Sequence, residues 1–536
     1  MIAADAQKSF TLRFKGGLIT DGMYRFIGHP NYLGEMITYG SFALMVWHWL
    51  PLPRIEREQH LDDERESFAQ LTWLDKRTTS GSWRIAKDSP NFPAWTCKVV
   101  GGTTVHWTAC SLRAQEHEFR AKDVYGDIAG ANLLNWPLTL AELEPYYDKA
   151  EDKMGVTGTH GIPLLDANNN QMVMAAGAKK VGYKECSTGN MAINSRPRDG
   201  RPATIHDGFC IQGIRSNAKW STLNAEIPKG EATGNLEVRP ECHVLRIEHD
   251  KSGKVTGVVY ADKEGHYHQQ RARIVCLAGN SIETPRILLN SASSRYPEGL
   301  ANSSRQVGRN YMRHTTGIIW AEFDKPVRMY RGSTLAGCIK DERYHKPSRE
   351  FVGGYYMQTM ALGLPFFASR LANNLDFAGW GREFTGTMEA YQCIAGMYLI
   401  GEDLPRETNR VTLHPTEKDQ FGTPIPIVHF DDHENDVAMR NHAYKRGAMV
   451  YDAMGATRII RCPPGSSTHN LGTCRQSARP EDGVCNKWGQ THDVENLFIS
   501  DGSQFTTSTA ENPTLTIVAL AIRQADYIDE QMATRL

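Results

Sequence analysis

The sequence predicts a mixed α/β protein of two or three domains, and three observations support this. The chain has 536 residues, several times the roughly 150 residues of a typical domain. Hydrophobic residues make up 40% and charged residues 23%, as in ordinary soluble globular proteins. In segments 271–290 and 497–532, an apolar strand-like run leads through a small polar turn into a helical pattern, which is typical of α/β sheets.

The charge balance argues against nucleic acid or an anionic membrane surface as a partner. Lysine and arginine total 60 and aspartate and glutamate total 61, so the formal net charge is −1. The eleven cysteines are scattered and form no C-x-x-C pair, which favours reduced thiols and argues against a zinc ribbon or a thioredoxin motif. We therefore expect no metal site.

The first fifty residues differ in character from the rest, and a charged stretch follows them. The N-terminal MIAADAQKSFTLRFK lacks an apolar core, so we expect no ordinary signal peptide and a cytoplasmic or membrane-associated location. Residues 36–52 are almost continuously apolar but shorter than the about 20 residues of a membrane span. A membrane-contacting segment and a buried helix both fit them. Residues 54–66 mix both charges densely, as in a solvated helix or linker.

Strands and a helix are predicted in order through the middle of the chain. Leu236–His249 alternates and is rich in β-formers, Asp250–Gly253 is a turn, and Lys254–Ala261 is a second strand. Arg271–Leu277 is a third, apolar strand. A helix is expected to start near Thr284–Pro285, with the proline in its first turn.

The C-terminal segment repeats this order. Leu497–Ser500 is a short strand and Asp501–Ser503 a turn. Asn512 can cap a long final helix, with Pro513 at its first position. The N–H groups at such a helix start favour an anionic ligand, although an ordinary capped helix would have the same sequence.

Two loops carry groups suited to chemistry. In Gly101–Thr108, paired glycines allow a backbone to approach a flat or anionic ligand, beside threonine hydroxyls and the rings of His106 and Trp107. His469 lies in a Pro/Gly/Ser-rich loop, and an imidazole with a pKa of about 6.5 suits proton abstraction near neutrality. Taken alone, the first could be a glycine turn before a strand and the second an ordinary loop histidine.

Together these segments resemble the glucose–methanol–choline (GMC) flavoprotein oxidoreductases over about residues 70–535, most closely the sugar and polyol dehydrogenases and the pyranose oxidases rather than the cholesterol oxidases. The motifs occur in the family's order. They are GGTTVHW (101–107), NWPLTLAELEPYYDKAE (135–151), IVCLAGNSIETPRILLNS (274–291), VGRNYMRH (307–314), STHNLGT (467–473) and NLFISDGSQFTTSTAENPTLTIVALAIRQADYI (496–528).

The resemblance implies FAD as cofactor and hydride transfer from an alcohol, such as a sugar or polyol, to the flavin. His469 would take the hydroxyl proton, and Asn512 would hydrogen-bond the same hydroxyl. His106 matches a histidine that some members bond covalently to flavin and others do not. The implied cofactor-binding residues are Gly101, Gly102, Thr103, Thr104, His106, Trp107, Thr108, Val244, Ala278, Gly279, Asp501, Gly502, Pro513 and Thr514.

The implied architecture is α/β (α+β), with an incomplete FAD-binding dinucleotide-type domain and a substrate domain that contains an antiparallel sheet. We expect residues 56–134, 195–320 and 455–536 in the first domain, and 135–194 and 321–454 in the second. Some relatives hold an iron–sulfur cluster through closely spaced cysteines. Here Cys210 stands alone in the corresponding segment, so we expect none.

One departure from the family pattern concerns the FAD phosphates. The family normally begins with a βαβ unit that carries G-x-G-x-x-G. The one G-x-G in this sequence is Gly379–Gly381, in mid-chain, and position 384 is Phe384. Without that unit we expect weak FAD binding, exposed sheet edges and exposed apolar surface.

The N-terminal segment resembles another family. Residues 15–51, with HPNYLGE at 29–35, resemble a fragment of the isoprenylcysteine methyltransferase and steroid-reductase-like membrane family, although Gly28 stands where arginine is usual. About forty residues are too few to form that family's site. We therefore expect residues 1–55 to be a membrane-enzyme-like fragment and linker. A gene fusion, a rearrangement and a misassigned gene start all fit this sequence.

The expected function is that of an FAD-dependent oxidoreductase acting on CH–OH groups. A quinone or a cytochrome is the expected electron acceptor, with oxygen as the alternative. Two other functions stay open: a non-catalytic remnant unable to hold FAD, and a fragment of a membrane methyltransferase or reductase. Flavin absorbance tests the first, and labelled methyl transfer or NADPH oxidation tests the second.

Overall fold

The computed structural model describes residues 98–206, 208, 210–211, 213–372, 381–462 and 468–532. The chain divides into two units, Met1–His60 and Leu61–Leu536, and all the described residues belong to the second. The predictions for residues 15–51, 36–52 and 54–66 therefore lie outside the described residues. Within the described ranges, none of the helices combines the length and the apolar character needed to cross a membrane.

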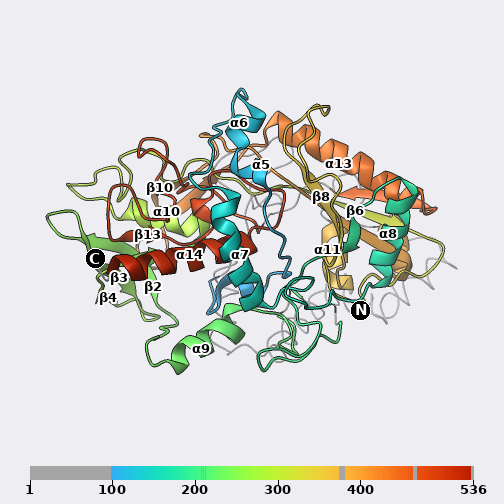
Figure 1. The fold of residues 1–536 in the computed structure, drawn as a ribbon, viewed down its shortest axis with the longest axis horizontal. Coiled ribbons are helices and arrows are strands. Elements are labelled where there is room, and N and C mark those ends of the chain that lie inside the picture. The colour runs from blue at the N-terminus through green and yellow to red at the C-terminus, as the bar shows by residue number, and fades with distance from the viewer. Residues whose placement is uncertain are drawn as a thin grey trace, which may run out of the picture. The chain divides into compact units, whose positions relative to one another are not determined.

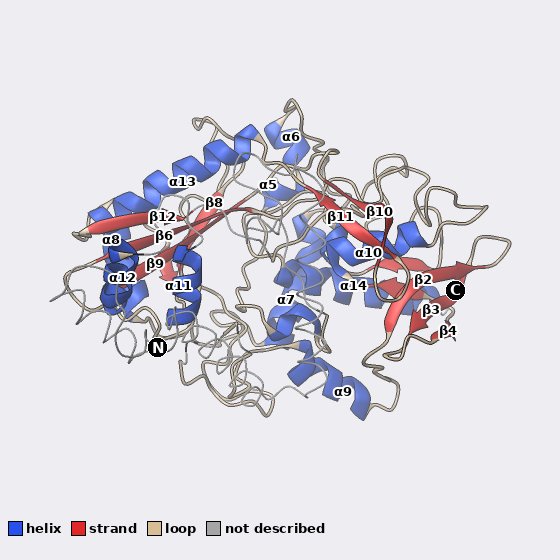
Figure 2. Ribbon diagram, turned by 180° about the vertical axis from the view of Figure 1, so that it is seen from behind, coloured by secondary structure: helices blue, strands red, loops and turns tan. Residues whose placement is uncertain are grey.

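A six-stranded antiparallel sheet forms one part of the described body (Figure 2). Its strand order is β1-β7-β8-β9-β6-β12, and β6 and β9 pair without interruption from Thr315–Gly401 to Glu322–Ile394. The strands are β1 (Cys186–Thr188), β6 (Thr315–Glu322), β7 (Gly337–Ile339), β8 (Tyr355–Thr359), β9 (Ile394–Gly401) and β12 (Arg458–Cys462).

Both faces of this sheet are covered. Helices α8 (Asn169–Lys180) and α13 (Glu434–Asp452) pack on one face, where Figure 2 shows them beside the strands. On the other face, the Trp320 ring of β6 meets the edge of Phe367 in α11 (Leu364–Ala372), with ring centroids 4.9 Å apart. Because strands buried on both faces need apolar side chains throughout, β6 reads as the nearly continuous apolar run TTGIIWAE.

The second part of the body is built on shorter sheets. A parallel pair joins β5 (Val275–Leu277) to β13 (Leu497–Ile499), beside an antiparallel sheet of β2 (His243–His249), β3 (Val255–Ala261) and β4 (Tyr267–Arg271). The helices here are α7 (Leu140–Met154), α10 (Asn280–Asn290) and α14 (Thr514–Met532). Helices α7 and α14 lie against each other across a core that includes Tyr147 and Leu515 (Figure 1).

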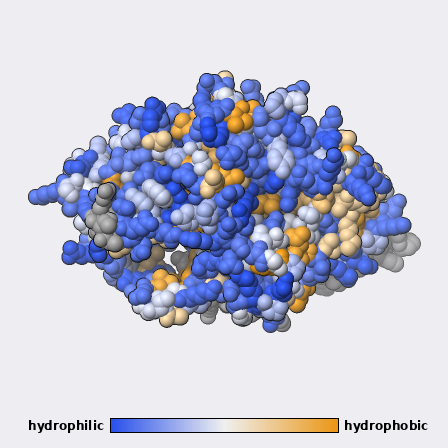
Figure 3. Space-filling view, in the orientation of Figure 1, coloured by the Kyte–Doolittle hydropathy of each residue, from blue (hydrophilic) through white to orange (hydrophobic). Residues whose placement is uncertain are grey.

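Shorter elements connect these parts. They are η1 (Gly102–Val105), α5 (Glu116–Phe119), α6 (Ala121–Tyr125), η2 (Thr222–Glu226), α9 (Ile227–Ala232), β10 (Arg410–Lys418), β11 (Pro424–His429), α12 (Arg382–Glu389), η3 (Ala390–Cys393) and η4 (Gly502–Gln504). The face seen in Figure 3 is mainly hydrophilic, with small scattered apolar groups. The apolar side chains that build the elements are gathered inside, as the buried clusters show.

The structure corrects several predicted element bounds. The predicted strand 236–249 is shorter, since β2 starts at His243. The predicted strand 271–277 is the end of β4 followed by the separate strand β5, and β4 was missed because its five side chains are all exposed and polar or aromatic. Helix α10 starts at Asn280, so Pro285 lies inside the helix, not in its first turn.

The described residues contain one parallel strand pair of the predicted dinucleotide-type domain. Among the described residues, β5 and β13 form a sheet of two strands only. The expected exposure of apolar surface does not follow there, because Leu277, Leu497 and Ile499 are buried in a cluster with residues of α10, β2 and β3. The six-stranded sheet also crosses the predicted domain bounds, since β6 and β12 fall mainly in ranges assigned to the FAD domain.

Candidate active site

The His469 loop is held by an antiparallel backbone pairing with the segment that leads into β6. Met312 and Leu471 exchange both backbone hydrogen bonds, with N–O distances of 3.0 and 2.9 Å. In that register the next residues on the same face are His314 and His469. Their Nδ1 atoms are 3.0 Å apart and their rings meet edge to face at 78°. Two histidines from distant parts of the sequence thus share one hydrogen bond.

Asn512 meets the other side of the His469 ring. Its Nδ2 lies 3.3 Å from His469 Nε2, and its Oδ1 accepts a hydrogen bond from the Tyr356 hydroxyl of β8. The final helix begins at Thr514, and the Pro513 carbonyl accepts the Ile517 N–H at 2.9 Å. The prediction that the Asn512 side chain caps this helix is therefore wrong, because both polar ends of the amide bind side chains.

Burial keeps both imidazoles neutral. Desolvation lowers the pKa of His469 to about 4 and lowers the pKa of His314 well below its usual value, the neighbouring His469 adding to the second effect. His314, Asn512 and Tyr356 are buried, whereas His469 keeps partial solvent contact. Because the His469 imidazole is neutral and partly open to solvent beside the buried Asn512 amide, it can accept a proton from a ligand hydroxyl.

The segment before Asn512 is anchored to α5. The Glu118 carboxyl accepts the backbone N–H groups of Gln115 and Ala510, each at 2.6 Å. Burial raises the pKa of Glu118 and raises the pKa of Glu511 to about 7, although Arg343, 3.5 Å from Glu511, opposes the second effect. Glu118 thereby ties the chain just before Asn512 to the start of α5.

The backbone at His314 is held in an uncommon conformation. Its φ is +67°, in the left-handed region that non-glycine residues rarely adopt. The buried Asp403 carboxylate accepts the N–H groups of Arg313 and His314 at 2.7 and 3.0 Å. Burial raises the pKa of Asp403 to about 6. Asp403 fixes the direction in which the His314 ring leaves the backbone.

The predicted glycine loop is fastened to residues 219–222. The hydroxyl groups of Thr104 and Thr222 both donate to the Gly101 carbonyl at 2.6 Å. Trp107 Nε1 donates to the Trp220 carbonyl at 2.9 Å. The buried Lys219 ammonium donates to the carbonyls of Val105, Trp107 and Cys210 at 3.0, 2.6 and 2.5 Å. The loop shape therefore depends on a lysine that sequence reasoning did not single out.

Glycine supplies the loop's tight geometry. Gly101 and Gly102 have φ of +91° and +59°. A Cβ at Gly101 would lie 2.6 Å from Leu223 Cβ, whereas one at Gly102 would meet no described residue within 4 Å. At His106, Nδ1 lies 3.0 Å from the Ile211 carbonyl oxygen, so Nδ1 carries the proton and Nε2 the lone pair. Within the described part of the chain Gly102 therefore faces open space. Nε2 is the ring nitrogen of His106 that carries the nucleophilic lone pair.

The predicted residues that follow strands β5 and β13 also lie close together. Asp501 follows β13, and its Oδ2 accepts the Asn280 N–H and the Thr284 hydroxyl, at 2.9 and 2.6 Å, at the start of α10. Gly502 O accepts the Gly472 N–H at 3.1 Å, which joins this turn to the His469 loop. Ala278 and Gly279 lie between β5 and α10, and Val244 lies in β2, which packs on α10.

The described residues include groups with the chemistry that the ring end of FAD would need. Gly101–Thr108, the neutral His469 and the start of α14, whose first N–H groups have no intrahelical partners, suit a flat ring with a polar edge. The start of α10 does not suit a phosphate, because the N–H groups of Gly279, Asn280 and Ile282 bind protein oxygens. Among the described residues, groups with the chemistry for a flat polar ring are therefore present, whereas these three N–H groups at the start of α10 are already bound to protein oxygens.

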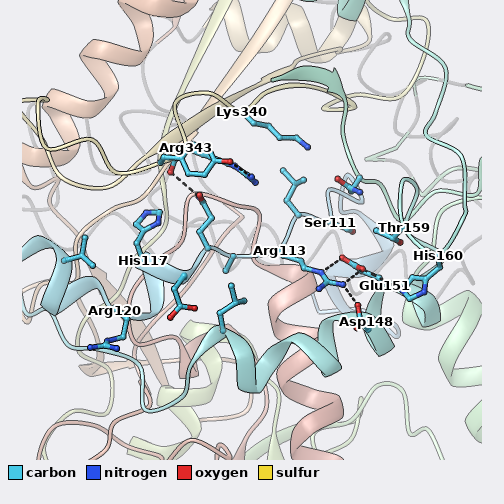
Figure 4. A pocket seen from close by; sticks show the side chains of 18 of the residues that line it. Ser111, Arg113, His117, Arg120, Asp148, Glu151, Thr159, His160, Lys340 and Arg343 are labelled. Carbon is cyan, nitrogen blue, oxygen red and sulfur yellow. Dashed lines mark hydrogen bonds and ion pairs between the residues drawn. The ribbon is translucent and has the colours of Figure 1, made fainter. Parts of the chain in front are cut away.

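An open cleft of about 1120 Å³ lies away from the predicted residues, none of which line it. Figure 4 shows Arg113 pointing to Asp148 and Glu151 on one wall, while Arg343 and Lys340 extend from the other. Arg343 links this wall to Glu511, the residue before Asn512, with a nitrogen–oxygen distance of 3.5 Å. The cationic and acidic lining side chains are mixed, so the cleft has no marked preference for one sign of charge.

Sequence reasoning missed His314, Tyr356, Asp403 and Lys219. His314 ends the motif VGRNYMRH, so a signal for it existed in the sequence. Tyr356 and Asp403 have no local pattern that separates them from ordinary buried residues. Lys219 is one of many lysines, and only its burial reveals its role.

The fold and the site define a class: an α/β enzyme in which a neutral imidazole and an amide meet beside the start of a long helix. The family model described as "GMC oxidoreductase" matches residues 74–316 and, for its C-terminal part, 405–521. The chain is 35% identical over 458 residues to 2-methyl-1,2-propanediol dehydrogenase of Mycolicibacterium austroafricanum, covering 81% of each chain. The chain belongs to the GMC oxidoreductase family.

Two further comparisons agree with this family and fold. Fructose dehydrogenase large subunit of Gluconobacter japonicus is 29% identical over 516 residues, with 90% of each chain covered. The fold matches formate oxidase of Aspergillus oryzae with a TM-score of 0.58 at 15% identity, covering 88% of this chain and 90% of that one. The protein is thus an oxidoreductase whose cofactor is FAD.

Proposed function

We propose that the chain oxidises a carbon-bound hydroxyl group of a small polyol or sugar, with His469 as the base and Asn512 as the group that holds the hydroxyl oxygen. The observation that carries this proposal is the 3.3 Å contact between His469 Nε2 and Asn512 Nδ2, at a neutral imidazole with partial solvent contact. The relatives support the substrate class, since they include a propanediol dehydrogenase and a fructose dehydrogenase.

The chemical reason is the pKa of an alcohol, which lies far above 7. A hydride can leave the carbon only as a base removes the hydroxyl proton. His469 accepts that proton at Nε2, and Asn512 Nδ2–H donates to the oxygen and holds the substrate. FAD supplies the hydride acceptor when it is bound.

The cofactor would be held at its ring end by Gly101–Thr108, Pro513 and Thr514, with Asp501, Gly502, Ala278, Gly279 and Val244 toward the nucleotide. We propose that the six-stranded sheet, which supplies Tyr356 and is continuous with His314, forms the substrate side. A quinone or a cytochrome is the proposed electron acceptor, with oxygen as the alternative. Whether His106 bonds to flavin is decided by denaturing the protein and testing whether the colour stays with it.

The test is anaerobic reduction of the flavin-containing protein by 1,2-diols and sugars. The reduction is measured as the loss of yellow flavin absorbance. His469→Gln should keep the absorbance and slow reduction by about 10²-fold or more, the lower end for loss of a general base. Asn512→Leu should weaken substrate binding and slow reduction. If His469→Gln reduces its flavin as fast as the wild type, the assignment of the base is wrong. A protein that stays colourless after incubation with FAD would support a remnant that cannot hold the cofactor.

A further inference from the structure

We propose that His314 is a positioning residue that fixes the tautomer of His469, by accepting the hydrogen on its Nδ1 so that Nε2 remains unprotonated and able to take the substrate proton. The inference rests on the proposed function and adds a third side chain to it. His314 does not itself reach the substrate in this scheme. It acts through the 3.0 Å contact between the two Nδ1 atoms.

The contact between the rings requires one donor and one acceptor. A neutral imidazole carries one N–H and one lone pair, so two neutral rings that meet through Nδ1 can pair in two ways. Either His469 donates and its Nε2 keeps the lone pair, or His314 donates and His469 Nε2 carries the hydrogen. The second arrangement removes the base from the site.

The neighbouring groups favour the first arrangement. The Tyr356 hydroxyl donates to Asn512 Oδ1, Asn512 Nδ2–H donates to His469 Nε2, and His469 Nδ1–H donates to His314 Nδ1. Among the described residues this leaves one buried donor, His314 Nε2–H, without an acceptor. The chain of bonds agrees with the contacts at every step.

The reverse arrangement leaves more buried polar groups without a hydrogen-bond partner. It requires the Asn512 amide to turn over, so that Oδ1 accepts from His469 Nε2–H and Nδ2 donates to Tyr356. Within the described ranges, the buried Tyr356 hydrogen then has no acceptor and the buried His314 Nε2 lone pair has no donor. Each such buried group costs about 1–3 kcal/mol. The first arrangement is therefore the more stable one.

The backbone is built to keep this pairing. The antiparallel register at Met312 and Leu471 sets the two histidines opposite each other, and Asp403 accepts the backbone N–H groups of Arg313 and of the strained His314. A left-handed non-glycine residue costs about 1–3 kcal/mol and persists only where its surroundings impose it.

The proposed step balances as a proton transfer. The hydroxyl O–H bond breaks, an N–H bond forms at His469 Nε2, and the O–H electron pair stays on oxygen. The imidazolium then carries hydrogens on both nitrogens, and its Nδ1–H continues to bind His314 Nδ1. The same partner thus serves the base before and after it takes the proton.

Two matched variants test this assignment in the flavin-containing protein. His314→Asn retains an acceptor oxygen near the position of Nδ1, and asparagine tolerates the left-handed backbone. His314→Leu removes the acceptor. Flavin reduction should slow at least about tenfold in His314→Leu, with the substrate dissociation constant nearly unchanged, and recover most of the rate in His314→Asn.

A second readout does not depend on turnover. The ¹⁵N spectrum of histidine-labelled full-length protein, assigned with His469→Gln and His314→Asn, should show His469 protonated at Nδ1 and unprotonated at Nε2 near pH 7. A hydrogen on Nε2 in the wild type would overturn the proposal, even if His314→Leu fails to fold. If His469→Gln is slow but His314→Leu is as fast as the wild type, the role of His314 fails while the proposed base stands.

Discussion

The burial of His469 predicts a specific loss of stability in acid, which His469→Gln should remove. Desolvation lowers the pKa of His469 from 6.5 to about 4. Between these values the unfolded chain binds a proton that the folded chain does not, so the free energy of unfolding falls as the pH falls. Above pH 6.5 the imidazole is neutral in both states and contributes no pH dependence.

The size of the effect follows from the two pKa values. Each pH unit over which the protonation states differ is worth about 1.4 kcal/mol, so the loss is about 2 kcal/mol at pH 5 and about 3 kcal/mol below pH 4. These are upper values, because the imidazole keeps partial solvent contact. Glutamine has no titrating group, so the variant should lack this slope.

The measurement is urea unfolding of both proteins at pH 7 and pH 5, at equal FAD occupancy. The wild type should lose up to about 2 kcal/mol more than His469→Gln between these pH values. His314 also has a lowered pKa, but burial, the larger cause of that lowering, is present in both proteins and cancels in the comparison. Parallel losses in the two proteins would refute the view that His469 is held neutral by burial.

Three further substitutions test the framework of the site. Lys219→Met leaves three loop carbonyls without their shared donor. The free energy of unfolding in urea should fall by about 3 kcal/mol or more, and flavin absorbance should be lost. The control Lys149→Met, at an exposed ion pair, should change the stability little. Gly472→Ala adds a Cβ that collides with the Asn310 carbonyl oxygen at a φ of +70°. Its melting temperature should fall far more than that of Gly455→Ala, where φ is +79° and no described residue lies within 4 Å of the added Cβ. Asp501→Asn places an NH₂ group against N–H and O–H donors at the start of α10 and should cost about 1–3 kcal/mol in urea unfolding. A stable Asp501→Asn protein with unchanged FAD affinity would show that this turn does not support the nucleotide end.

Local pattern was enough to predict much of the body. Strands β3 and β13 and the start of α14 lie within one or two residues of the predicted bounds. Turn residues and apolar runs mark these elements in the sequence itself. The family, its fold class and FAD followed from motifs that keep their order along the chain, and the comparisons confirm them.

Sequence patterns failed to predict the elements and contacts that depend on residues distant in the sequence. Strand β4 is polar and exposed, so its pairing with β3 gives no hydrophobic signal. Pro285 suggested a helix start, yet α10 begins five residues earlier because Asp501, from the far end of the chain, binds the Asn280 N–H. Asn512 looked like a helix cap, but its amide is bound by His469 and Tyr356.

The sequence by itself determined which residue types were available for chemistry: an imidazole in a small-residue loop, an amide before a helix and a pair of glycines. Tertiary structure alone decided their protonation and partners. The pKa of His469 depends on burial, and its hydrogen bond to His314 depends on an antiparallel register between segments about 155 residues apart. Desolvation and register are properties of packed neighbours, and a linear pattern does not contain them.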